Sequence, residues 1–136
     1  MVEAKRCDMK SILIAEGHER VAELFAYLSA HEGWSVTMYR DGKPAAAALG
    51  GSAAYDAVLV SNRLRDMGGV ALITRIRAID HRKEVPIVIV TGTLEVAVVA
   101  GALAAGADDV LYKPVDVTVL VATVNKCVEC ARRQRE

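Results

Sequence analysis

Five short apolar runs, rich in β-branched residues, alternate along the chain with longer segments whose apolar residues recur at helical spacing. Strands buried on both faces of a parallel sheet have this continuous apolar character, and turn residues bound each run. The alternation therefore predicts repeated β-α units on one parallel sheet. The predicted strands are 11–15, 35–39, 56–60, 86–90 and 109–112.

The segments between these runs predict five helices, at 19–31, 44–50, 70–78, 95–105 and from 117 to a polar end at 131–136, with Asp116 as the N-cap of the last. The first helix places four apolar residues on one expected buried stripe, namely Val21, Leu24, Phe25 and Leu28. In the third helix, Arg75 and Arg77 are expected to face solvent.

The length of 136 residues fits one domain, with a lead at 1–9 and a polar helical tail at 129–136. Seventeen basic residues balance seventeen acidic ones, so we expect no nucleic-acid partner. The apolar stretches are shorter than the roughly 18 residues of a membrane span, and we expect no membrane partner. The mixed charges of the first ten residues argue against export and predict a cytoplasmic protein.

Three cysteines, Cys7, Cys127 and Cys130, are too few and odd in number for a disulfide framework. Cys127 and Cys130 form a C-x-x-C and share one face of a predicted helix. Without a second Cys or His pair they are weak support for zinc, and we interpret them as two small helix residues. The sequence predicts no metal site and no cofactor.

Four stretches in order carry a resemblance: ILIAEG at 12–17, YDAVLVS at 55–61, VPIVIVTG at 85–92 and GADDVLYKP at 106–114. Together they resemble the receiver domains of bacterial two-component response regulators, from about residue 10 to residue 128. The resemblance implies a flavodoxin-like (CheY-like), doubly wound α/β fold. Its five-stranded parallel sheet would have the order 2-1-3-4-5, with five helices. Binding and chemistry in such sheets collect at the carboxyl ends of the strands.

In that family an aspartate that ends strand three attacks a phosphoryl group, while acidic residues hold Mg²⁺. Here Ser61 stands at the nucleophile position and Gly17 at the second acidic position, so only Glu16 remains of the acidic set. One carboxylate is too little for Mg²⁺, and a neutral hydroxyl without a base is a poor nucleophile. We therefore predict a degenerate pocket without a catalytic residue, in a protein that is not an enzyme.

The resemblance implies that Thr91 and Lys113 complete this pocket, where the family uses them to sense and bind the phosphoryl group. Here we expect Lys113 to form an ion pair with Glu16 and Thr91 to hydrogen-bond Ser61. The resemblance also implies a cis peptide bond before Pro114.

A second departure from the family lies on strand five. Val110 replaces the usual switch aromatic, and Tyr112 is expected on the opposite side of the strand. The coupling between pocket and outer face that the resemblance implies is therefore predicted to be absent.

The predicted helix 95–105 has almost no polar residue, so either a partner covers it or it is a loosely packed alanine-rich helix. The resemblance makes this region a docking and dimer surface. Candidate partners are a histidine kinase, an output domain or a second copy, which would form a homodimer through helix four, strand five and helix five. The predicted interface residues are Val96, Val98, Gly101, Ala104, Val110, Tyr112, Val119 and Thr123.

Arg63, Arg65 and Asp66 include an R-x-x-D pattern that some cyclic-dinucleotide sites use, although solvated loop charges are a simpler interpretation. The favoured function is a pseudo-receiver that signals by protein–protein contact without phosphorylation. Two alternatives stay open, a small-molecule sensor and a phosphoacceptor with a non-standard site.

Overall fold

The computed structural model describes residues 10–92 and 95–135, and these form a five-stranded parallel sheet of order β2-β1-β3-β4-β5. The strands are β1 (Ser11–Ala15), β2 (Ser35–Tyr39), β3 (Ala57–Ser61), β4 (Ile87–Thr91) and β5 (Asp109–Tyr112). The predicted strand order is confirmed. β3 and β4 each lie one residue later than predicted, and at β4 one reason is that Pro86 has no N–H to donate to the ladder.

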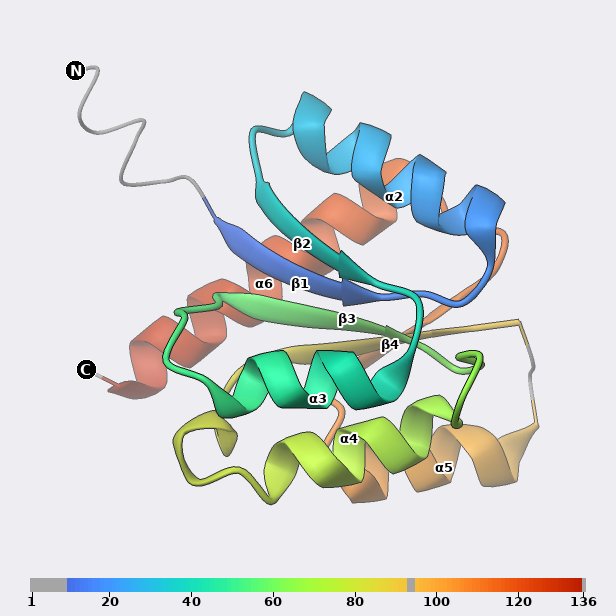
Figure 1. Cartoon of the computed structure of the whole chain (residues 1–136). Coiled ribbons are helices and arrows are strands. Elements are labelled where there is room, and N and C mark those ends of the chain that lie inside the picture. The colour runs from blue at the N-terminus through green and yellow to red at the C-terminus, as the bar shows by residue number, and fades with distance from the viewer. Residues whose placement is uncertain (1–9, 93–94, 136) are drawn as a thin grey trace, which may run out of the picture.

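Five helices accompany the sheet, as predicted: α2 (Glu19–His31), α3 (Gly42–Gly50), α4 (Gly69–Arg77), α5 (Val96–Ala105) and α6 (Val117–Arg135). Figure 1 shows α2 and α6 on one face of the sheet and α3, α4 and α5 on the other. A short 3₁₀ helix, η1 (Asp80–Arg82), was not predicted. None of the helices described is both long and apolar enough to cross a membrane.

The core has two halves, one on each face of the sheet, because β3 and β4 are buried along their whole length. On the first face, α2 contributes Phe25 and Leu28 to the core, but Leu24 is exposed, contrary to prediction. Ala22 and Ser29 are buried in its place, and Ser29 is satisfied there because its hydroxyl donates to the Phe25 carbonyl oxygen at 2.7 Å.

Arg77, predicted to face solvent, instead lies half-buried at the end of α4. Its guanidinium donates to the carbonyl oxygens of Gly106 at 2.8 Å and Val85 at 2.7 Å, and to the Asp108 carboxylate at 3.1 Å. Burial lowers the pKa of Arg77 from its ordinary value. This side chain ties α4 to the segments that lead into β4 and β5.

Candidate functional site

Glu16 follows β1 at the carboxyl edge of the sheet and is fully buried. Its Oε2 accepts the backbone N–H of His18 at 2.9 Å. Its Oε1 lies 3.1 Å from the Lys113 ammonium nitrogen, and this ion pair is the contact that balances the carboxylate, since no hydrogen bond to a described residue reaches Oε1. The predicted Glu16–Lys113 pair is confirmed.

Ser61 is the last residue of β3 and is buried beside Lys113. The Lys113 ammonium donates to the Ser61 hydroxyl oxygen at 3.2 Å, so one lysine contacts both the surviving carboxylate and the serine. The Lys113–Pro114 peptide bond is cis, as the resemblance implies. Thr91 ends β4 next to these residues and is also buried, while its hydrogen bond to Ser61 stays a prediction.

Gly17 is enclosed by the loop that follows β3. A Cβ at this position would lie 3.0 Å from the Arg63 carbonyl oxygen and 3.1 Å from the Leu64 Cα, closer than ordinary van der Waals contact. The guanidinium of Arg40 also donates to the Gly17 carbonyl oxygen at 2.9 Å and fixes the backbone from the other side. An acidic side chain at position 17 would therefore displace backbone.

These residues do not fit the Mg²⁺ ion that the family uses. Mg²⁺ requires near-octahedral oxygen ligands and usually takes one or two carboxylates. The single carboxylate here, Glu16, is already paired with the Lys113 ammonium, and Gly17 has no side chain to supply a second oxygen ligand. The described residues also contain no cluster of three or more His, Cys, Asp or Glu that could hold a metal ion.

Two adjoining cavities open at this edge of the sheet. One, of about 270 Å³, is lined by Ser61, Asn62, Arg63, Gly92 and Lys113. The other, of about 340 Å³, lies beside Glu16 and Gly17 and also includes Arg63 and Lys113. Arg63 and Lys113, which line both cavities, are cationic, so an anion is the kind of ligand that this edge of the sheet suits.

The loop residues Arg65 and Asp66, predicted as possible ligand contacts, have structural partners. Arg65 forms a two-point ion pair with Asp41, at 2.6 and 3.0 Å, which raises the pKa of Arg65. The Asp66 carboxylate accepts the backbone N–H groups of Gly42 and Lys43 at the start of α3, and these bonds lower the pKa of Asp66. Arg63, by contrast, has no side-chain hydrogen bond or ion pair with a described residue.

The prediction that Val110 and Tyr112 lie on opposite sides of β5 is wrong. Side chains alternate along a strand, so residues two apart share a face. Val110 packs against the core half that includes α4, whereas Leu111 between them packs against the half that includes α6. Tyr112 is thus on the Val110 side, 44% exposed, in register with Thr91 of β4.

α5 exposes apolar side chains, as its composition predicted. Val96 is 81% exposed and Leu103, which the sequence analysis did not single out, is 48% exposed. Ala104 is also exposed, Val98 and Gly101 are half-buried, and a Cβ at Gly101 would meet open space. Among the residues of α5, Ala102 alone is buried.

The α6 part of the predicted interface is only partly accessible. Val119 is 49% exposed, and Val117 at the start of α6 is 39% exposed. Thr123 is buried, contrary to prediction, because it lies on the stripe of α6 that holds Leu120 and Val124 against the sheet. Of the two predicted interface residues on α6, Val119 is therefore accessible and Thr123 is not.

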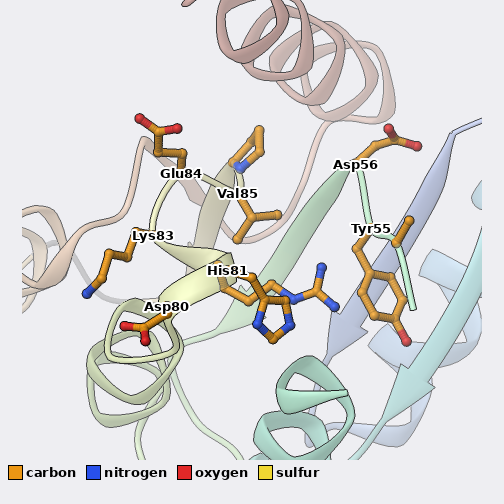
Figure 2. A pocket seen from close by; sticks show the side chains of 10 residues that line it. Tyr55, Asp56, Asp80, His81, Lys83, Glu84 and Val85 are labelled. Atoms are coloured by element: carbon orange, nitrogen blue, oxygen red, sulfur yellow. The ribbon is translucent and has the colours of Figure 1, made fainter. Parts of the chain in front are cut away.

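A larger cavity, of about 580 Å³, lies at the opposite edge of the sheet, before β3 and β4 (Figure 2). Its wall includes Tyr55, His81 and the buried Arg82. Arg82 donates to the carbonyl oxygens of Leu49, at 2.8 Å, and Ala53, and its guanidinium lies 5.2 Å from the centre of the Tyr55 ring. These contacts hold the C-terminal end of α3, so the Arg82 guanidinium has a structural role in the wall of this cavity. The sequence did not predict that Arg82 is buried, because this residue lies in a short polar stretch.

Comparisons with known proteins agree with this architecture. A sequence profile described as the response regulator receiver domain matches residues 12–125. The chain is 38% identical over 117 residues to the sensory transduction protein RegX3 of Mycobacterium tuberculosis, covering 85% of this chain and 49% of that protein. It is 32% identical over 117 residues to the response regulator ArlR of Staphylococcus saprophyticus, covering 85% of this chain and 51% of that protein. The chain thus spans about half the length of these relatives.

Among solved structures, the receiver domain of the sensor histidine kinase PA1611 from Pseudomonas aeruginosa, with a magnesium ion in its active-site cleft, is 26% identical. It aligns with a TM-score of 0.82 over 89% of this chain and 98% of that one. A CheY-like receiver domain protein from Methanospirillum hungatei aligns with a TM-score of 0.84 at 22% identity, over 93% and 99% of the two chains, which supports the fold. The strand order, the helices on both faces and the matched residues lead to one conclusion: this chain belongs to the response regulator receiver domain family.

Proposed function

We propose that this receiver domain takes part in two-component signalling through protein–protein contact and without accepting a phosphoryl group. The observation that carries this proposal is the arrangement of Glu16, Lys113 and Ser61. The one buried carboxylate is neutralised by the lysine, and the lysine also binds the hydroxyl that stands where the family has its nucleophile.

The chemistry of these groups supports the proposal. A serine hydroxyl becomes a nucleophile when a base removes its proton. Here the Ser61 oxygen accepts a hydrogen bond from an ammonium, which withdraws electron density from it. An imidazole could act as such a base, but the side chain of His18 is exposed and is not among the contacts of Ser61.

The surface available for contact is the face formed by Val96, Leu103, Ala104, Tyr112 and Val119. It is apolar, and burying exposed apolar area contributes about 25 cal/mol per Å². The partner is a signalling protein, either a histidine kinase or an output domain, or a second copy of this chain. The cytoplasmic location and the absence of a nucleic-acid partner stay predictions.

The test is an NMR titration of the ¹⁵N-labelled domain, first with Mg²⁺ and then with beryllofluoride, an analogue of the bound phosphoryl group. We expect unchanged amide signals for the loops after β1, β3 and β4. A receiver domain that has the aspartate and the acidic pair serves as the positive control. Saturable shifts around Ser61 that require both reagents would show a working phosphoacceptor site and would refute the proposal.

Arg63 supports a second candidate function, that of a sensor for a small anionic ligand. Arg63 and Lys113 together line the 270 Å³ cavity, and Arg63 has no ion pair with a described residue. Because Arg65 and Asp66 are held by Asp41 and α3, the R-x-x-D pattern itself gives little support for a cyclic dinucleotide. Calorimetry with cyclic dinucleotides and with inorganic phosphate tests this candidate, and absence of heat in both would remove it.

A further inference from the structure

The two cysteines of α6 border the same cavity at the edge of the sheet away from Ser61. This cavity, of about 170 Å³, lies between α6 and the segments before β4 and β5. Cys127 is buried and Cys130 is exposed, and neither forms a disulfide. The remaining lining residues are Glu84, Pro86, Asp108, Lys126, Ala131 and Gln134.

The spacing places both sulfur atoms on one side of the helix. Residues three apart in an α-helix are neighbours, with about 5–6 Å between their Cβ atoms. Two thiols at this separation, one at the floor of the cavity and one at its rim, can bind the same atom. Neither thiol has a role in the carboxyl-edge site described above.

The electrostatic surroundings favour a cation at this place. Asp108 lines the cavity and Asp109 adds a second negative charge near Cys127, while Lys126 opposes them. A cation bound at this place would relieve the negative potential of these two carboxylates. Lys126, whose ammonium lies 3.6 Å from the Asp109 carboxylate, can balance part of the charge of a two-thiolate complex.

The number of ligands selects the kind of cation. Structural zinc sites use four ligands, and the described residues contain no cluster of three His, Cys, Asp or Glu that could hold a metal. Thiolates are soft ligands that suit Cu⁺, and Cu⁺ accepts two-coordinate binding. A pair of cysteines is sufficient for Cu⁺ and insufficient for zinc.

We propose that Cys127 and Cys130 form a two-thiolate binding site for a soft monovalent cation of the Cu⁺ type. Each thiol releases its proton to solvent as its sulfur binds, and no electron is transferred. When two thiols bind one Cu⁺, the products are a complex with a net charge of −1 and two protons released to solvent. The site is separate from the proposed signalling function and does not depend on it.

Competition for Cu⁺ against a coloured chelator, under reducing and anaerobic conditions, tests the proposal. The protein is the full chain with Cys7→Ser, which leaves the two α6 cysteines. We expect one Cu⁺ per chain, and an affinity that rises about a hundredfold per pH unit while both thiols are protonated, because two protons leave. Cys130→Ser should lower the affinity at least a hundredfold, and because residue 130 is exposed, circular dichroism should show an unchanged fold.

The matched control keeps two thiols but separates them. Glu129→Cys combined with Cys130→Ser places the thiols two residues apart, on different sides of α6. This variant should bind as weakly as Cys130→Ser alone. Unchanged affinity in either variant would overturn the proposal, and so would one Cu⁺ per two chains together with dimers in gel filtration, since that result means bridging between molecules.

Discussion

The Lys113 ammonium lies between two side chains of the carboxyl edge, 3.1 Å from the Glu16 carboxylate and 3.2 Å from the Ser61 hydroxyl oxygen. One cation thus satisfies the last acidic residue of the pocket and the residue at the nucleophile position. The Glu16 carboxylate is thus already balanced by a protein group, which is why a single substitution is not expected to return phosphoryl chemistry.

Ser61→Asp should fail to restore phosphorylation. The substitution would supply a nucleophilic carboxylate. Gly17 would still leave the metal site one carboxylate short, and Glu16 would still be paired with Lys113. Incubation with labelled acetyl phosphate and Mg²⁺ should give no more incorporation than Ser61→Ala. Rapid labelling of Ser61→Asp alone would show that Mg²⁺ binds without an acidic residue at position 17.

Gly17→Asp should destabilise the domain, by about 1–3 kcal/mol, because its Cβ would press on the backbone of Arg63 and Leu64. Gly101→Ala is the matched control, since a Cβ there meets open space and removing a mid-helix glycine should stabilise by about 0.5–1 kcal/mol. Urea unfolding measures both. Equal stability of Gly17→Asp and the unaltered protein would show that the loop after β3 yields readily.

Arg77→Ala should cost about 2–3 kcal/mol of unfolding free energy, because it removes charge-assisted hydrogen bonds and leaves partly buried carbonyl oxygens without these donors. Arg75→Ala, two residues earlier and exposed on the same helix, should change stability by less than about 0.5 kcal/mol. Thermal and urea unfolding compare the pair. A similar loss in both variants would mean that the positive charge near the C-terminal end of α4, and not the contacts of Arg77, sets the effect.

Asp66 should make the start of α3 sensitive to acid. Its pKa is lowered in the folded protein from 3.8, so its contribution is present above that value and is lost as pH falls through the lower folded value. Asp66→Asn should therefore be less stable than the unaltered protein at neutral pH, and the difference should shrink below about pH 4. Urea midpoints between pH 2.5 and 7 measure this, and a difference that stays constant over the range would contradict it.

Most of the fold could be predicted because apolar runs and turn residues repeat along the chain. The limits of β1, β2, β5 and α2 agree with the prediction. The misplaced helix residues, Leu24, Arg77 and Thr123, all depend on how far each helix is rotated about its axis against the sheet, which spacing in sequence defines only to within part of a turn.

The candidate site could be predicted in part. The Glu16–Lys113 pair could be inferred because both residues follow strands that end at the same edge. The closing of the loop over Gly17, the capping role of Asp66 and the shared cavity of Cys127 and Cys130 depend on contacts between segments distant in sequence, and no local pattern reports them.

Val96→Glu with Leu103→Glu should abolish binding to a partner or to a second copy without unfolding the domain, since both residues are largely exposed. Leu24→Glu with Tyr27→Glu on α2 introduces the same charges at exposed apolar positions on the other face of the sheet. Sedimentation velocity measures self-association, and co-purification with the cognate histidine kinase measures partner binding. Loss of binding in the α2 variant alone would move the contact surface to α2.

α5 contains no side chain that can donate or accept a hydrogen bond. A partner that covers it can recognise only its shape, and shape alone discriminates poorly among apolar surfaces. Fidelity toward one partner must then come from polar groups at the rim of this surface, such as the phenol of Tyr112 on β5. Changes at this rim should redirect the domain to another partner more readily than changes within the helix.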